Sequence, residues 1–174
     1  MEPAQRIPIP SARDSRFSPD RNRIALVTQP GLVLWDISKR RIVWQFPDSF
    51  IRNLVYSPDG SLIATCGTNR MVHIVNAVDG STRFQSTNHR APVRTIAFSP
   101  DGRLLATGAD DGTIKFWHVA TGQELLELQN PGDGVRHLEF TDDGDRLICQ
   151  LGRQGTDPAS SDRILIFDGS RFEP

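Results

Sequence analysis

The most informative stretch of the chain is residues 93–121, which read VRTIAFSPDGRLLATGADDGTIKFWHVAT. Three short apolar runs in this stretch are separated by two turn signals. The first is Ser-Pro-Asp-Gly at 99–102, where proline presets φ, aspartate can bond its own backbone and glycine tolerates a positive φ. The second is Asp-Asp-Gly at 110–112, which suits a tight hairpin. The stretch therefore predicts three antiparallel strands joined as a meander.

The same pattern recurs along the chain. An aromatic residue followed by a short turn signal occurs four times, with spacings of 39, 42 and 42 residues, at Phe17, Tyr56, Phe98 and Phe140. A repeat of about this length, with four short strands in each unit, is typical of β-propeller blades. The middle strands of these units are apolar on both faces, which indicates burial between neighbouring sheets. The clearest runs are 24–27, 62–64, 104–106 and 147–149.

A second landmark follows each of these aromatic residues. It comes 18 or 19 positions later in the first three units and 27 positions later in the fourth, at Trp35, Val75, Trp117 and Phe167. These two landmarks together resemble WD40-repeat β-propellers, and the resemblance covers nearly all of the chain, from about residue 11 to 168. It implies an all-β fold of four blades, each a four-stranded antiparallel meander, in one WD-repeat domain over residues 1–174. The approximate units are 11–46, 51–86, 89–129 and 135–168.

The third unit matches the family best. The resemblance places the structural hydrogen-bond tetrad of the family on His89, Thr107, Asp111 and Trp117. A histidine between a carboxylate and a hydroxyl resembles a catalytic triad, but a buried network of this kind is a satisfied polar cluster. It lacks the exposed nucleophile and oxyanion donors that acyl transfer needs, so we interpret it as structural.

Two other units depart from this tetrad. The second has Val75 at the tryptophan position and Arg70 at the aspartate position. The fourth has Pro131 at the histidine position and Phe167 at the tryptophan position. We therefore do not expect every blade to be held together in the same way.

The number of strands leaves the closure of the ring open. The first three units each contain four predicted strands, whereas the fourth contains three and lacks an outer strand. Residues 6–9 precede the first inner strand and could complete the fourth unit, as chain ends do in closed WD-repeat rings. Three alternatives remain: a small closed ring, an eight-bladed ring of two copies, or part of a longer polypeptide whose ends pack on further blades.

One polar position repeats with the landmarks. An arginine stands four residues before each of the four spaced aromatics, at Arg13, Arg52, Arg94 and Arg136. Inner strands line the channel of a propeller, so these side chains could surround one mouth of it. Guanidinium groups bind carboxylates and phosphates bidentately, which predicts an acidic partner segment or another anion there. The alternative is that these arginines simply point to water.

Composition narrows the function classes. The formal net charge of −1 over 174 residues argues against nucleic-acid binding driven by bulk electrostatics. There is no polybasic segment for a membrane surface and no apolar run of roughly 20 residues, so we expect no membrane association and a cytoplasmic location. The two cysteines, Cys66 and Cys149, lie in apolar runs of different units and are predicted to be buried thiols, with a disulfide as the minor alternative.

The sequence contains no recognisable reactive site. The four histidines are scattered without the spacing of metal ligands, and phosphate-loop, dinucleotide and nucleophile-elbow motifs are absent. We therefore expect no metal and no cofactor, and predict a non-catalytic protein–protein interaction scaffold. The alternatives are a terminal sensor or regulatory portion of a larger multidomain protein, and a propeller enzyme with its site over the central channel.

Overall fold

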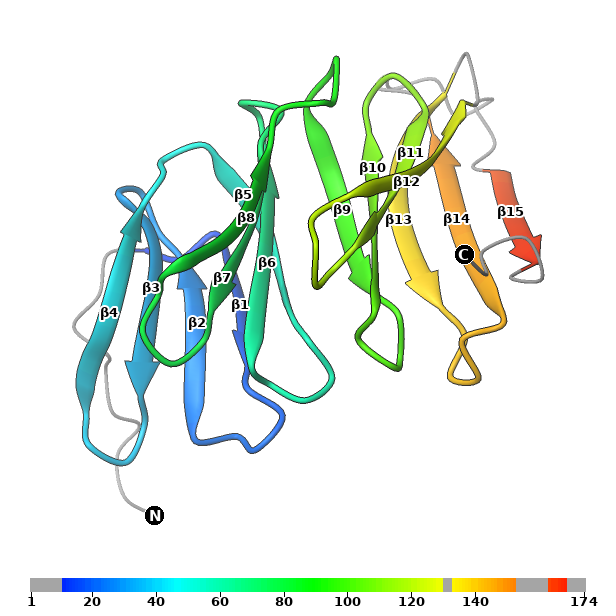
Figure 1. Cartoon of the computed structure of the whole chain (residues 1–174). Helices are drawn as coiled ribbons and strands as arrows, with labels where there is room; N and C mark the ends of the chain where they lie inside the picture. The colour runs from blue at the N-terminus through cyan, green and yellow to red at the C-terminus, as the bar shows by residue number, and fades with distance from the viewer. Residues whose placement is uncertain (1–10, 130–132, 153–162, 169–174) are drawn as a thin grey trace.

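The chain folds into four antiparallel sheets. The computed structural model describes residues 11–129, 133–152 and 163–168, and within them it contains fifteen strands and no helix. Each sheet consists of strands that are consecutive in the chain, and we call each sheet a blade. The predicted all-β meander architecture is confirmed (Figure 1). None of the described segments is a helix with the length and hydropathy of a membrane span.

The first two blades have four strands each. Blade 1 consists of β1 (Asp14–Phe17), β2 (Arg23–Val27), β3 (Gly31–Asp36) and β4 (Arg41–Pro47). Blade 2 consists of β5 (Ile51–Tyr56), β6 (Leu62–Gly67), β7 (Val72–Asn76) and β8 (Thr82–Ser86).

The third blade again has four strands, and the described residues of the fourth have three. Blade 3 consists of β9 (Val93–Phe98), β10 (Leu104–Ala109), β11 (Thr113–His118) and β12 (Glu124–Gln129). Blade 4 consists of β13 (Gly134–Phe140), β14 (Arg146–Gly152) and β15 (Arg163–Asp168). Residues 6–9, the predicted closing strand, lie outside the described residues.

The turn chemistry explains why each blade forms locally. In blade 3, the Ser99 hydroxyl donates to the Asp101 carboxylate at 2.6 Å and accepts the backbone N–H of Leu104 at 2.9 Å. Gly102 completes the turn with a φ of 72°, a conformation that is unfavourable for residues with a Cβ. These bonds satisfy the polar groups of the turn, so the two flanking strands pair in one register.

Successive blades pack through apolar faces. Ala25 and Leu34 of blade 1 share a core cluster with Leu54 and Ile63 of blade 2. A second cluster joins Ala64 and Ile74 of blade 2 to Ile96 and Trp117 of blade 3. A third joins Ala106 and Phe116 of blade 3 to Leu138 and Leu147 of blade 4. Full burial of one large apolar side chain contributes about 1.5–3 kcal/mol, so these junctions supply most of the stabilisation between blades.

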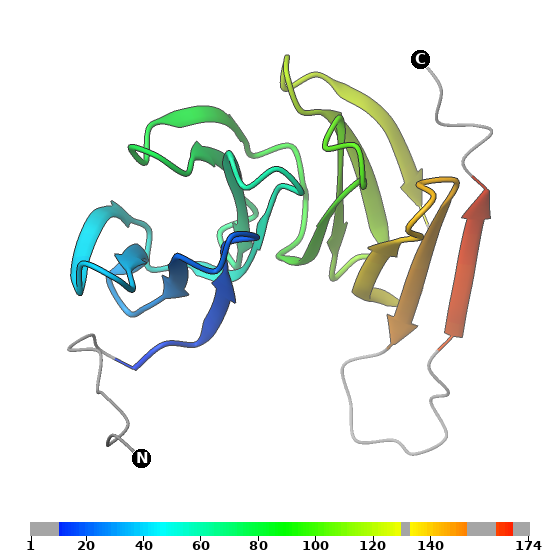
Figure 2. The ribbon, with the colours of Figure 1, turned by 90° about the horizontal axis from the view of Figure 1, so that it is seen from below.

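The four blades do not close into a ring. Figure 2 shows them side by side in chain order, with blade 1 and blade 4 at opposite ends of the row. The inner strands β1, β5, β9 and β13 contact one another in sequence along this row. The small closed ring is therefore excluded for the single chain, whereas the other two alternatives remain.

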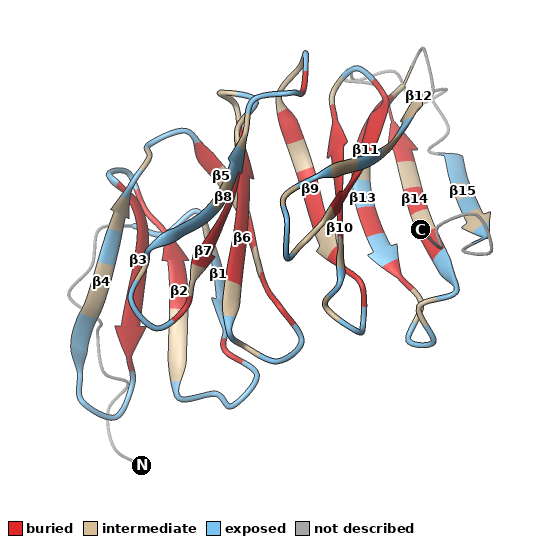
Figure 3. Ribbon diagram, viewed as in Figure 1, coloured by how far each residue is buried: buried red, intermediate tan, exposed pale blue. Residues whose placement is uncertain are grey.

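The burial of β14 differs from the prediction. Its apolar run was expected to be buried on both faces, as β6 and β10 are along nearly their whole length. Instead, burial alternates along β14, with Leu147 and Cys149 buried but Ile148 only partly covered (Figure 3). The reason is that blade 4 has a neighbouring blade on one side only among the described residues.

Candidate functional site

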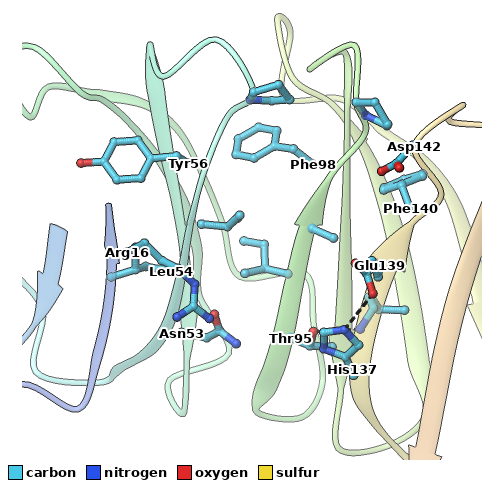
Figure 4. Close-up of a pocket in the computed structure, with 16 residues that line it drawn as sticks. Arg16, Asn53, Leu54, Tyr56, Thr95, Phe98, His137, Glu139, Phe140 and Asp142 are labelled. Atoms are coloured by element: carbon cyan, nitrogen blue, oxygen red, sulfur yellow. Dashed lines mark hydrogen bonds and ion pairs between the residues drawn. The ribbon is translucent and has the colours of Figure 1, made fainter. Parts of the chain in front are cut away.

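The inner strands line a groove. A cavity of about 420 Å³ runs along β1, β5, β9 and β13 (Figure 4). Polar side chains line one side of the cavity, and the turns that follow the inner strands line one end of it. The polar lining residues are Arg16, Asn53, Thr95, His137, Glu139 and Asp142. Apolar positions, such as Val55, Ala97, Pro58 and Pro100, complete the wall.

Polar side chains tie neighbouring inner strands together. The position equivalent to Thr95 carries a polar residue in every blade, and in the first three it bonds the backbone of the next inner strand. The three bonds are Leu54 N–H to Asp14 at 3.3 Å, Asn53 Nδ2 to the Arg94 carbonyl at 3.3 Å, and Leu138 N–H to Thr95 at 3.1 Å. These bonds set the spacing of the groove walls, so the groove is a preformed feature of the fold.

The predicted arginine positions lie just before these residues. Arg94 Nε donates to the Asp110 carboxylate at 2.7 Å, and Arg136 Nη1 lies 3.9 Å from the same oxygen. The hydrogen bond to Asp110 raises the pKa of Arg94. The structure thus brings two of the four arginines onto one carboxylate.

The other two arginines are held by uncharged groups. Arg13 Nη2 donates to the side-chain carbonyl of Gln29 at 2.8 Å. Arg52 Nη1 donates to the carbonyls of Ser49 at 3.1 Å and Ile51 at 2.9 Å. Among the described residues, neither guanidinium forms an ion pair, so the positive charge of both remains uncompensated there. The sequence reasoning missed Asp110, although its place in the turn after β10 was visible.

Three of the four tetrad residues form a hydrogen-bonded chain in blade 3. His89 Nε2 lies 2.7 Å from Thr107 Oγ1, and Trp117 Nε1 donates to the same oxygen at 2.9 Å. The Asp111 carboxylate instead accepts the backbone N–H of Thr113 at 3.0 Å. His89 Nδ1 is buried and has no hydrogen-bond partner. The structure therefore joins His89, Thr107 and Trp117 and places Asp111 in its own turn.

The environment of His89 predicts a pH-dependent stability. Burial, and then the Lys115 ammonium, lower its pKa from 6.5 to about 4, although Asp111, Glu124 and Glu127 oppose the shift. At pH values between about 4 and 6.5, His89 is protonated in the unfolded chain but neutral in the folded chain. The free energy of unfolding should therefore fall by about 2 kcal/mol from a pH of about 7 to about 5.

Urea unfolding at the two pH values measures this loss, and His89→Gln is the matched variant. The variant should lose much less stability over the same range. A small loss would remain, because the pKa of His73 is also lowered, mainly by burial. Equal losses in the two proteins would show that His89 is not responsible.

A buried lysine next to this chain was not anticipated from the sequence. Lys115 is almost fully buried, and its ammonium contacts Glu124 at 2.8 Å and Glu127 at 2.7 Å. These two bonds raise the pKa of Lys115 against the opposing effect of burial. The available signal was a lysine in the middle of an apolar strand with acidic residues on the following strand.

The register of blade 2 corrects one assignment. Asn69, rather than Arg70, is equivalent to Asp111, because its Oδ1 accepts the N–H two residues later at 3.2 Å in the same way. Arg70 has a φ of 66° and takes the place of Gly112, whose φ is 83°. The prediction was wrong by one position because an arginine in the left-handed region is not recognisable as a glycine equivalent in sequence.

Blade 2 also lacks the tetrad bonds. Thr65 is equivalent to Thr107, and its hydroxyl is buried without a hydrogen-bond partner. Val75 stands where Trp117 donates in blade 3, so the indole donor is missing. Instead, Asp48 contacts His73 Nε2 at 3.2 Å and accepts Asn69 Nδ2 at 3.2 Å.

Blade 4 departs in a third way. Phe167 pairs with Leu147 in the register of the tryptophan position, while Pro131 lies outside the described residues. Cys149 takes the position of Thr107. It and Cys66 are free and buried, which confirms the prediction of two buried thiols. Burial raises the pKa of both thiols, that of Cys149 to about 11.

The polar groups of the groove do not converge on one point. Arg16 is paired with Asp14 at 2.8 Å. His137 lies 3.6 Å from Glu139, and these two side chains are both exposed (Figure 4). Within the described ranges, no three His, Cys, Asp or Glu side chains are grouped so that they could hold a metal ion. The arrangement can present a shaped, partly apolar surface with charged edges.

Two models of known protein families match this chain. One, described as WD domain, G-beta repeat, matches residues 80–118, which extend from the end of blade 2 through β11. The other, described as Anaphase-promoting complex subunit 4 WD40 domain, matches residues 15–92, which include most of blades 1 and 2. A comparison with curated proteins found no match.

These two matches agree with the architecture. Both models describe WD40 repeats, and together their ranges extend from residue 15 to 118 over blades that have the expected antiparallel meander. WD40 repeats generally mediate protein–protein interactions, and WD40 domains are typically not enzymes. The chain belongs to the WD40-repeat family.

Proposed function

We propose that this protein is a non-catalytic interaction scaffold that binds an extended segment of a partner protein in the groove along β1, β5, β9 and β13. The observation that carries the proposal is the groove itself, a cavity of about 420 Å³ with apolar walls and polar edges. Pockets of this kind bind through apolar contact and obtain specificity from a few polar groups. Stacked blades already hold these walls in fixed positions, so the groove loses little conformational entropy when a partner binds.

None of the four repeated arginines lines the cavity itself, but Arg52, Arg94 and Arg136 each directly precede a residue that does, and this positive charge favours an acidic segment. Arg13 and Arg52 bond only to uncharged groups among the described residues, so their charges are available to a carboxylate at little cost. Arg94 and Arg136 share Asp110 and contribute less net charge. Because guanidinium groups bind carboxylates bidentately, an acidic side chain entering between Arg13 and Arg52 is the best match.

An enzyme is the weaker alternative. Catalysis by acid and base needs titratable groups that converge on one reacting atom. In this groove Arg16 instead pairs with Asp14 and His137 lies near Glu139, so these titratable groups are spread along the strands. That distribution supports binding rather than chemistry.

Charge reversal tests the acidic-segment proposal. A fluorescent polyglutamate peptide should bind at low ionic strength, and Arg52→Glu should weaken binding at least about tenfold, because a charged hydrogen bond of about 1.5–3 kcal/mol is lost. Arg83→Glu makes the same charge change at an exposed position on the outer strand β8 and is the matched control. Anisotropy titrations with the three proteins measure the difference. If both variants weaken binding equally, the peptide senses net charge alone and the arginine site is wrong.

A further inference from the structure

The two end blades of the row carry exposed apolar residues at positions that are buried in the internal junctions. In each internal junction, the last residue of the inner strand packs against the preceding blade, and Tyr56, Phe98 and Phe140 are each only 8% exposed. The equivalent residue in blade 1 is Phe17, which pairs with Ile24 in the same register and is 60% exposed. Blade 1 therefore exposes an aromatic side chain at this junction position, whereas Leu26, Val33 and Trp35 on the same face are buried.

Blade 4, at the opposite end of the row, also exposes apolar side chains that are buried in the internal blades. Ile164 and Ile166 of β15 are equivalent by register to Ile114 and Phe116 of β11. The residues of β11 are 0% and 1% exposed because blade 4 covers them, whereas Ile164 and Ile166 are 67% and 62% exposed (Figure 3). Exposed large apolar residues side by side on one strand mark an interaction surface. Blade 4 thus carries apolar side chains for a following blade.

The turns at the rim show which blade fits there. In all three internal junctions, a turn proline of one blade faces a turn glycine of the next. A Cβ built on the glycine would lie 3.1, 3.7 and 3.6 Å from the proline Cδ in the pairs Pro19–Gly60, Pro58–Gly102 and Pro100–Gly144. At the two ends of the row, this pattern is replaced by charges. Asp142 takes the proline position in blade 4, and Arg21, with a φ of 57°, takes the glycine position in blade 1.

A second rim position changes in the same way. Trp44 of blade 1 packs on Gly80, and Phe84 of blade 2 packs on Gly122, where any Cβ would lie within 2.8 and 2.2 Å of the ring. Blade 1 has Arg40, with a φ of 53°, at this glycine position, so a preceding blade with such an aromatic would clash. Among the described residues, blade 4 has no strand after β15 to carry that aromatic. Blade 1 of another copy could therefore follow blade 4 without this clash, whereas it could not follow a blade that carries such an aromatic, as blades 1 and 2 do.

We propose that blade 4 of one copy of this chain packs on blade 1 of a second copy. The exposed row of Ile164 and Ile166 would cover Phe17 of the second copy, as the internal junctions do. Asp142 would then face Arg21, and neither side chain forms an ion pair among the described residues. The opposite charges at these two rim positions favour this occupant over a further blade with the usual proline and glycine.

The inner edge of the junction adds a polar contact. His137 is equivalent to Asp14, Asn53 and Thr95, each of which bonds the backbone of the next inner strand. In the single chain, His137 is exposed, and its one ion-pair contact among the described residues is the 3.6 Å approach to Glu139. In the assembled pair, the backbone of β1 of the second copy takes the place of the next inner strand.

Two such contacts would close the assembly. A head-to-tail contact forms a ring when its rotation closes and an open fibre when it does not. Each copy contributes four blades, and two copies give an eight-bladed ring, at the upper end of the usual range of about four to eight. The pair would therefore have a two-fold axis along the channel and no open blade face.

The test is the solution mass and its response to matched substitutions. Light scattering over a concentration series should give twice the chain mass of 19.4 kDa. Ile166→Glu should weaken the pair at least about a hundredfold, because it buries an unpaired charge. Val78→Glu is the control, since Val78 is 65% exposed in a turn of blade 2 away from both end faces. Both positions are exposed in the single chain, so circular dichroism should show unchanged folding.

Charge exchange makes the register of the contact testable. Asp142→Arg and Arg21→Asp should each weaken the pair about tenfold or more, and the double variant should recover most of the loss. A monomer at all concentrations would overturn the proposal, as would a dimer that tolerates Ile166→Glu or masses that keep rising beyond two copies. A dimer with no recovery in the double variant would overturn the pairing of Asp142 with Arg21.

Discussion

Trp117→Ala should lower the free energy of unfolding by about 3–5 kcal/mol, the usual cost of truncating a large buried aromatic side chain. Trp117 is almost fully buried in the cluster between blades 2 and 3, and its ring lies 5.4 Å from that of Phe84. Its indole also donates to Thr107 at 2.9 Å. The substitution therefore removes packing between blades and a hydrogen bond within a blade at once. Urea unfolding followed by far-ultraviolet circular dichroism measures the loss.

Two further variants separate these contributions. Trp117→Phe keeps most of the apolar volume and removes the indole donor, so it should cost only about 1–2 kcal/mol. Trp35→Ala changes the same register position in blade 1, where the local cluster contains residues of that blade alone, and it should cost less than Trp117→Ala. If Trp35→Ala proved as costly as Trp117→Ala, packing between blades would not be the main source of stability.

Gly122→Ala should cost about 2–5 kcal/mol. Gly122 has a φ of 71°, which costs a residue with a Cβ about 1–2 kcal/mol. The new methyl would also lie 2.2 Å from Cδ2 of Phe84, so the outer strand of blade 2 must move away. Overpacking of this kind typically adds about 1–3 kcal/mol. Thermal unfolding and urea unfolding of the variant measure the sum.

Gly144→Ala is the matched control for this prediction. Gly144 has a φ of 76°, but a Cβ there would lie an ordinary 3.6 Å from Pro100. Its substitution should therefore show the backbone cost alone. Equal losses at Gly122 and Gly144 would mean that Phe84 moves freely and that the outer strands contribute little to the junction.

The sequence by itself was enough to predict the elements of the fold. The turn Ser99-Pro100-Asp101-Gly102 holds its own backbone through bonds that span at most five residues, such as those between Ser99 and Leu104. Interactions over such short separations involve residues that are close in sequence, so they can be predicted from a short sequence motif. The spacing of Tyr56, Phe98 and Phe140 then places one meander in each repeat, and the observed strands follow it.

Part of the candidate site could also be predicted. The repeat placed His89, Thr107 and Trp117 in one unit, and the structure joins these three by hydrogen bonds. The repeat did not predict that Asp111 accepts the N–H of Thr113 instead of bonding to His89. A turn aspartate can bond either to its own turn or to a neighbouring side chain, and the sequence does not distinguish these two. The arginine positions were visible as a repeat, but Asp110, which lies near both Arg94 and Arg136, comes from the turn after β10 rather than from an inner strand.

Only the tertiary structure decided which faces are covered. Ile148, Ile164 and Ile166 have the apolar character of buried blade residues, and nothing in the local sequence distinguishes them from Ile114 or Phe116. Their exposure depends on whether another sheet lies next to blade 4, which is a property of the whole stack. The sequence by itself therefore determined the strands, the turns and the repeat, because those depend on neighbours along the chain. The stacking of sheets determined the approach of Arg136 to Asp110, the burial of Lys115 and the exposure of Ile164 and Ile166, because those depend on residues brought together from distant positions.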